Sequence, residues 1–170
     1  MEDILPFEDS QKIIFSQKKI SIPTDLRPMY KISLILMMLK INGHSKRLSY
    51  LQIQYLNWLI KHIEKVEDLN LKNDELPFEI IRPDPFLDIA IEYCIGEKLI
   101  QLTNQGKLEL TTKAEVFINK LINEKLLKDE YKVLKNIGSR KVTDEKIKMM
   151  IGGNWYAKIN FKRFENKYFY

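Results

Sequence analysis

Residues 100–110 read IQLTNQGKLEL, and this stretch decides how the rest of the sequence is interpreted. Two short runs, in which apolar and polar residues alternate, surround the turn Asn104-Gln105-Gly106. A three-residue turn ending in glycine between such runs predicts a β-hairpin. The residues Thr112 to Glu115 follow directly and have a capping-box pattern, which predicts that a helix begins there.

Three helices are predicted before the hairpin. The first covers 28–42, because Pro28 suits a first turn and Asn42-Gly43 is typical of a helix end. The second is capped by Ser45 or Ser49 and continues to about residue 63, with apolar side chains at helical spacing. The third covers 85–99, since Asp84-Pro85 combines an N-cap with a first-turn proline.

The chain after the hairpin is predicted to be helical again. One helix begins at the capping box and includes Leu126 and Leu127, and Gly138 ends it or its continuation. A last short helix is capped by Thr143 and stops at Gly152-Gly153.

The order helix, helix, helix, hairpin, helix is that of a winged helix, a variant of the helix-turn-helix. The sequence therefore predicts a mainly α fold with a small β-hairpin, in which the winged-helix domain with its C-terminal helices covers 27–151. An extended N-terminal segment at 1–26, with a short strand at 13–15, precedes this domain, and an aromatic-basic tail at 152–170 follows it. Winged helices serve either DNA or protein partners, so the fold alone does not decide the function.

The helix 85–99 takes the place of the helix that a DNA-reading winged helix inserts into the major groove. Asp84, Asp88 and Glu92 are four residues apart and are predicted to form one stripe. DNA carries about one negative charge per 1.7 Å of its axis, so an acidic stripe opposes groove reading. The stripe is either a solvated helix face or a docking edge for a basic partner. The core side of this helix is taken by Ile91, Ile95 and Leu99, or by Leu87, Ile91 and Cys94.

Few residues point to catalysis. Cys94 is the single cysteine of 170 residues, which excludes an internal disulfide and favours a reducing cytoplasm. Cys94 is expected to be a buried hydrophobe, and neither His44 nor His62 has ligand-spaced companions. The glycines match no phosphate-binding loop, and the longest apolar run, 32–39, is too short to cross a membrane. We therefore expect a cytoplasmic protein that is not an enzyme and needs neither metal nor cofactor.

The net charge of +5 is unevenly distributed. Residues 10–65 contain ten bases and two acids, residues 68–100 eight acids and three bases, and residues 132–170 ten bases and three acids. The tail from Trp155 to Tyr170 also holds seven of the eighteen aromatic residues, with cations between them. Such a tail suits stacking on nucleic-acid bases or insertion into a partner, or else forms a final strand on the same domain.

Several segments occur in an order that resembles a known family. They are RPMYKI at 27–32, LNWL at 56–59, RPDP at 82–85 leading to EKLI at 97–100, LTTK at 110–113, and LKNIGSRKVT at 134–143. Together they resemble the small middle component of bacterial three-component ABC-ATPase defence systems of the Lamassu type. The resemblance covers 27–151, but the glycine that is usual near 112–114 is absent.

The resemblance implies a non-catalytic accessory subunit of an SMC-like ABC ATPase, which is a dimer whose heads the subunit bridges. It also implies a role in antiviral and anti-plasmid defence, where the complex controls an effector, often a nuclease, and contacts DNA without reading its sequence. The alternative is a stand-alone winged-helix DNA-binding transcription regulator. A small nuclease is a third hypothesis, which the lack of a metal cage disfavours.

Two sets of binding residues are predicted, and the helices 28–42 and 85–99 are expected to carry protein contacts. The partner-binding set is Arg27, Tyr30, Lys31, Trp58, Asp84, Asp88, Glu92, Trp155, Tyr156, Phe161 and Phe164. The DNA-binding set is Lys46, Arg47, Lys107, Lys158, Lys162 and Arg163.

Overall fold

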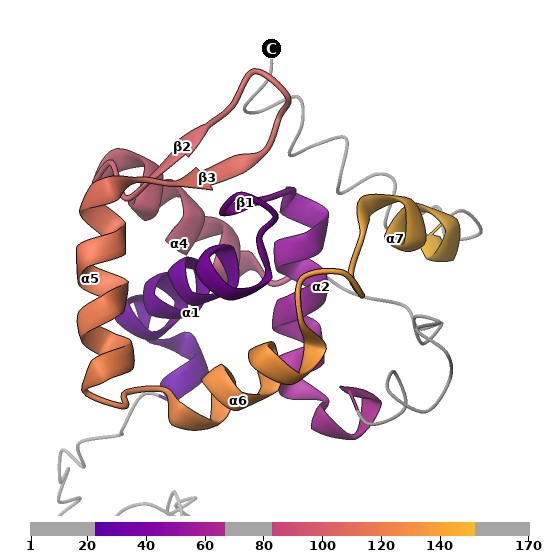
Figure 1. Ribbon diagram of the computed structural model, residues 1–170, viewed down its shortest axis with the longest axis horizontal. Helices are drawn as coiled ribbons and strands as arrows, with labels where there is room; N and C mark the ends of the chain where they lie inside the picture. The colour runs from indigo at the N-terminus through magenta and orange to yellow at the C-terminus, as the bar shows by residue number, and fades with distance from the viewer. Residues whose placement is uncertain (1–22, 67–82, 152–170) are drawn as a thin grey trace, which may run out of the picture.

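The computed structural model describes residues 23–66 and 83–151, which form a mainly helical fold with a small three-stranded antiparallel sheet (Figure 1). The elements are η1 (Thr24–Leu26), α1 (Pro28–Asn42), β1 (Arg47–Leu48), α2 (Tyr50–Lys61), α4 (Pro85–Gly96), β2 (Ile100–Leu102), β3 (Leu108–Leu110), α5 (Thr112–Asn123), α6 (Lys128–Ile137) and α7 (Asp144–Ile151). The predictions for the strand at 13–15, the stop at Gly152-Gly153 and the tail lie outside the described residues.

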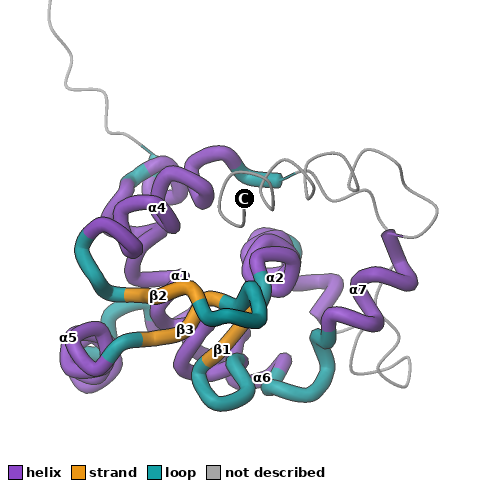
Figure 2. The backbone as a smooth tube through the Cα atoms, turned by 90° about the horizontal axis from the view of Figure 1, so that it is seen from above, coloured by secondary structure: helices purple, strands orange, loops and turns teal. Residues whose placement is uncertain are grey.

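Helix α1 is the centre of the fold. Every residue from Lys31 to Leu39 is buried, and so is Asn42. The helices α4, α5 and α6 and the strand β3 pack around it, with α4 and α6 on different sides (Figure 2). A helix that is apolar on all sides belongs in a core. The predicted bounds 28–42 are confirmed. Because the residues from Lys31 to Leu39 are buried, the expectation that this helix carries partner contacts is wrong for those turns.

Helix α2 begins with a complete capping box. The Ser49 side chain accepts a hydrogen bond from the Gln52 backbone N–H at 3.1 Å, and the Gln52 side chain accepts one from the Ser49 backbone N–H at 2.9 Å. Both bonds satisfy backbone donors that the first helical turn leaves without partners. Of the two predicted caps, Ser49 is the correct one, while Ser45 lies in the preceding turn at φ 53°.

The predicted hairpin is confirmed, and a third strand extends it. Strands β2 and β3 pair antiparallel around Gly106, whose φ of 72° is the left-handed conformation that glycine accommodates best. Strand β1 pairs with the other edge of β3, which gives the strand order β1-β3-β2. The sequence did not predict β1, because two residues are too few to show an alternating pattern.

Two helix boundaries near the hairpin differ from the prediction. Helix α4 ends at Gly96 rather than at 99, since Lys98 turns into the left-handed region at φ 56° and the Leu99 N–H donates to the Cys94 carbonyl at 2.8 Å. Helix α5 is capped by Thr111 rather than Thr112, and the Thr111 hydroxyl accepts from the Ala114 N–H at 3.4 Å.

The helix that was predicted to continue from the capping box forms two separate helices, α5 and α6. The predicted continuation through Leu126 and Leu127 is broken, because Lys125 and Leu127 adopt φ values of 57° and 55°. Helix α6 then covers Lys128–Ile137, and Gly138 is its C-cap, as predicted for the continuation.

The side chain of Asn42 joins the end of α1 to the end of α6. Its amide donates to the carbonyls of Leu134 and Gly138, both at 2.9 Å. The predicted cap of the last helix is also confirmed, since the Thr143 hydroxyl accepts from the Lys146 N–H at 3.3 Å. Helix α7 packs against α2 and buries Ile147.

Candidate docking face of helix α4

The acidic residue before α4 points into the fold. Asp84 caps the helix by accepting from the Phe86 N–H at 3.0 Å, and its carboxylate also accepts from Lys31 Nζ at 2.7 Å and Lys61 Nζ at 3.1 Å. The Lys31 side chain is only 1% exposed, and its ammonium also donates to the Asn57 side chain at 3.1 Å. Lys31 and Asp84, both predicted to bind a partner, therefore bind each other and join α1 and α2 to α4.

Asp88 is half-buried one turn later. Its carboxylate accepts from the Tyr50 hydroxyl and from the Gln54 side-chain amide, both at 2.8 Å. The Gln54 side chain in turn accepts from the Asp84 N–H at 3.0 Å. Of the three acids in the predicted stripe, only Glu92 is exposed. The expectation of an exposed stripe, either solvated or docking, is therefore wrong for Asp84 and Asp88.

Asp84 and Asp88 interact with charged and polar side chains inside the fold, and these interactions affect their pKa values. Burial lowers the pKa of Lys31, although Asp84 opposes the shift. Burial also acts to raise the pKa of Asp84, but the hydrogen bonds and charges of Lys31 and Lys61 outweigh it and hold that pKa at about 2. Burial raises the pKa of Asp88 in spite of its bonds to Tyr50 and Gln54. Asp84 is thus ionised and paired inside the fold at neutral pH.

The outer face of α4, which comprises Phe86, Ile89, Glu92, Tyr93 and Glu97, is apolar and acidic. Phe86, Ile89 and Tyr93 are 44%, 47% and 55% exposed. Their spacing of three and four residues places them side by side on one helix surface. The inner face buries Leu87, Ala90, Ile91 and Cys94, which confirms the second of the two predicted core sets.

An open depression of about 340 Å³, here called the α4 depression, lies on this outer face. Its lining includes Ile89, Glu92, Tyr93, Gly96 and Glu97. A Cβ atom added at Gly96 would meet no other atom within 4 Å. The missing side chain of Gly96 therefore leaves space that a partner can occupy.

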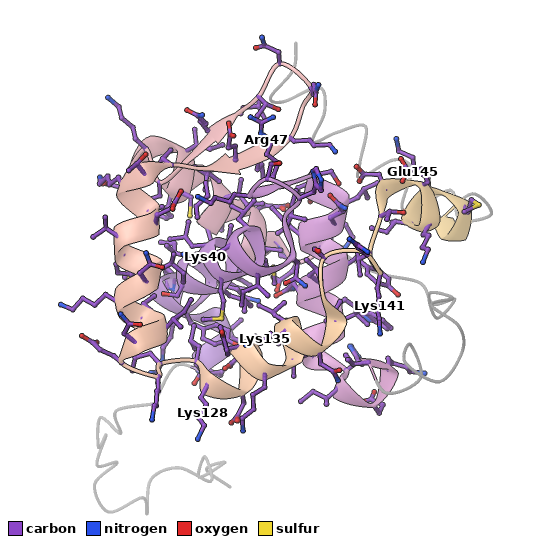
Figure 3. The ribbon with its side chains drawn as sticks, in the orientation of Figure 1. Lys40, Arg47, Lys128, Lys135, Lys141 and Glu145 are labelled. Atoms are coloured by element: carbon purple, nitrogen blue, oxygen red, sulfur yellow. The ribbon has the colours of Figure 1, made fainter. Side chains whose placement is uncertain are left out.

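The bases predicted to contact DNA are paired with acids wherever the structure describes them. Lys46 pairs with Glu115, Arg47 Nη2 lies 2.7 Å from the Glu109 carboxylate, and Lys107 Nζ lies 3.9 Å from that of Asp144. Figure 3 shows Arg47 beside the sheet, on a different edge of the molecule from Lys128 and Lys135 of α6. Phosphates would have to compete with these carboxylates.

The other predicted bases, Lys158, Lys162 and Arg163, lie outside the described residues, as do the predicted tail contacts Trp155, Tyr156, Phe161 and Phe164.

The remaining described candidates lie at the start of α1 and near the end of α2. Arg27 is exposed before α1, and the Tyr30 hydroxyl donates to Glu130 of α6 at 3.0 Å. Trp58 is half-buried and stacks on His62 with ring centroids 4.7 Å apart. Tyr30 also lines a second cavity of about 250 Å³ between α1, α2 and α6. Among the residues that the structure describes, neither Tyr30 nor Trp58 belongs to the lining of the α4 depression.

Cys94 is fully buried on the inner face of α4, as predicted, and burial raises its pKa to about 12. A thiol with that pKa carries little of the reactive thiolate at neutral pH. Within 23–66 and 83–151, no three His, Cys, Asp or Glu side chains are grouped to hold a metal ion. In the same ranges, no helix is both long enough and apolar enough to pass through a bilayer.

Comparison with known proteins gives no relative from which to assign this site: no family model, no curated protein and no solved structure matches the chain. The outer face of α4 is the feature that sequence reasoning missed. Its signal was present, because Phe86, Ile89 and Tyr93 form a second apolar stripe beside the one that enters the core.

Proposed function

We propose that this chain is a non-catalytic, winged-helix accessory subunit that binds protein. Its partner is an SMC-like ABC ATPase, whose heads the subunit bridges in a complex that controls a nuclease-type effector against phages and plasmids. The observation that carries the protein-binding role is the exposed apolar and acidic outer face of α4.

The order of the elements supports the winged-helix assignment. A helix (α1), a strand (β1), two helices (α2 and α4) and a hairpin (β2 and β3) follow one another, and β1 adds to the edge of the hairpin. In this arrangement α4 takes the position of the recognition helix of a DNA-binding winged helix.

The composition of α4 favours a protein partner over DNA. A helix that reads the major groove uses Arg, Lys, Asn or Gln to contact base edges, and α4 contains none of these residues. Its exposed residues are instead Phe86, Ile89 and Tyr93, which gain free energy when a partner removes them from water. Glu92 and Glu97 beside them repel phosphates and attract a basic surface.

The family resemblance supplies the identity of the partner. Two of the segments that carry it, 82–85 and 97–100, flank α4. The resemblance therefore includes both ends of the helix that bears the exposed face. In the complex, DNA is contacted through phosphates and without sequence reading, which makes the contact sensitive to salt.

The proposal requires an SMC-like ABC ATPase in the gene neighbourhood of this chain, and co-expression of the two proteins tests it. We expect the two proteins to elute together in size-exclusion chromatography, and the variant with Ile89→Ser and Tyr93→Ser to elute alone. A variant with Lys128→Gln and Lys135→Gln on α6 is the matched control, and it should retain the complex. A wild-type chain that elutes alone and monodisperse would contradict the proposal.

The competing transcription regulator makes the opposite prediction for DNA. It requires the isolated chain to bind one duplex sequence far more tightly than others, and to lose this binding when Lys46, Arg47 and Lys107 are changed to Gln. We expect no such specificity, because an acidic and apolar α4 has no side chains that distinguish bases.

A further inference from the structure

We propose that the α4 depression binds a single apolar side chain of a partner segment that carries Lys or Arg next to that side chain. This inference rests on the proposed protein-binding function and specifies the chemistry of the segment that α4 binds.

The walls of the depression favour an apolar side chain. Ile89 and Tyr93 are one helical turn apart and present apolar surface to the open space. Gly96 lies about one turn beyond Tyr93 and two turns beyond Ile89, and it contributes no side chain. A leucine, methionine or phenylalanine side chain can therefore enter the depression and remove part of its apolar surface from water.

The charges around the depression favour a basic flank. Glu92 and Glu97 both line it, and Lys113 Nζ lies 3.8 Å from the Glu97 carboxylate. Both members of that pair are exposed, at 62% and 71%, so water screens it and an incoming cation can compete. The carboxyl end of α4 adds the partial negative charge of its last carbonyls.

Selection from a displayed library of random 16-residue peptides against the full-length chain tests the proposal with a defined probe. We expect enriched peptides to share one large apolar residue with Lys or Arg adjacent to it. Fluorescence anisotropy of one labelled peptide should then give a dissociation constant that rises about ten-fold or more in Gly96→Gln.

The Gly96→Gln variant keeps this test interpretable. The new side chain starts in open space, and Gly96 lies in a helix, where glycine is the poorer residue. We therefore expect the variant to fold with wild-type thermal stability or better. The control is Val116→Gln on α5, where the side chain is 70% exposed, and it should change the peptide affinity by less than about two-fold.

The salt dependence tests the charged flank separately. The doubly substituted chain with Glu92→Gln and Glu97→Gln should bind the same peptide more weakly, and its affinity should fall less steeply with added salt. Enrichment of acidic or uncharged peptides, or unchanged binding by Gly96→Gln, would overturn the proposal.

Two other occupants give distinct results, and each would also overturn it. If the tail of this chain occupies the depression, a synthetic peptide of residues 152–170 competes with the selected peptides. In that case Phe161→Ser with Phe164→Ser in the full chain tightens peptide binding. If a second copy occupies it, sedimentation equilibrium shows a dimer that Gly96→Gln dissociates.

The proposed function and this inference can fail separately. Peptides that depend on Gly96 support the inference even if the ATPase does not co-elute. If the ATPase co-elutes equally with the Gly96→Gln variant, the proposed function stands and the inference is wrong.

Discussion

Helices α4 and α6 pack on different sides of α1, and they distribute charge in opposite ways (Figure 2). Helix α6 exposes Lys128, Lys132 and Lys135 and buries Leu134 and Ile137. Helix α4 directs the carboxylates at its start inward, to Lys31, Tyr50 and Gln54, and exposes large apolar side chains.

Burial of apolar surface during folding explains the surface of α6, but it does not explain the surface of α4. The lysines of α6 lie in water and its leucine lies in the core, which is the pattern that burial of apolar surface produces. Exposed Phe86, Ile89 and Tyr93 on α4 do not contribute to the core in this way. An apolar surface of this kind is the observation from which we propose that α4 binds a protein. The following predictions test this contrast, starting with the largest effect.

Asp84→Asn should be the most destabilising of these changes, at about 3–5 kcal/mol, because it leaves the buried Lys31 ammonium without its anion. Urea unfolding followed by circular dichroism measures the loss. The control is Lys31→Met, which removes the buried charge and leaves Asp84 paired with Lys61 at the surface. Equal losses in the two variants would show that the lysine is not held as a buried charge.

Leu134→Ala should destabilise α6 by about 2–5 kcal/mol, because the side chain is completely buried and its removal leaves a cavity. The same unfolding measurement applies. This loss should not vary between pH 7 and pH 3, since no charge is involved. A strong variation with pH would mean that α6, like α4, depends on an internal ion pair.

Low pH should reduce the free energy of unfolding through Asp84, the residue that caps α4. The pKa of Asp84 is about 2 in the fold, below its ordinary value, so its contribution to stability is present above pH 4 and is lost as the pH falls towards 2. Between neutral pH and about pH 2, the wild type should lose about 2 kcal/mol of unfolding free energy that the Asp84→Asn variant does not lose. Asp88 has the opposite sign, because its raised pKa makes protonation favourable to the fold. A pH profile that is identical in wild type and Asp84→Asn would contradict the assignment.

Changes on the outer surfaces should have the smallest effect on stability. Ile89→Ser on α4, and Lys128→Gln with Lys135→Gln on α6, should each change the free energy of unfolding by no more than about 0.5 kcal/mol. Thermal denaturation measures this, and only Ile89→Ser should then impair partner binding. A large destabilisation by Ile89→Ser would mean that the exposed stripe supports the fold.

The sequence predicted the elements whose signals are local. Ser49, Thr143 and Gly138 all lie at the helix ends for which they were candidates, because a cap needs only its own neighbouring residues. The break after α5 was missed because Lys125 and Leu127 adopt left-handed conformations, which a sequence signals only when glycine stands at such positions. Strand β1 was missed because it depends on β3, about sixty residues further along the chain.

The candidate site was less accessible to sequence reasoning. The spacing of Asp84, Asp88 and Glu92 correctly places them along α4, but spacing does not state which side of a helix faces the core. That depends on Lys31, which is 53 residues from Asp84 and lies within an apolar helix. A lysine in such a helix requires a buried anion, and this was the one signal from which the inward direction could be inferred.

The bonds of Asn42 to the carboxyl end of α6 define where the folding unit ends. Asn42 is 3% exposed, and its side-chain amide donates to the carbonyls of Leu134 and Gly138. A protein truncated before Leu134 would lose both of these bonds and also the buried side chains of Leu134 and Ile137. We therefore expect a stable fragment that begins at α1 to extend to Gly138, because α6 packs against the same central helix as α4.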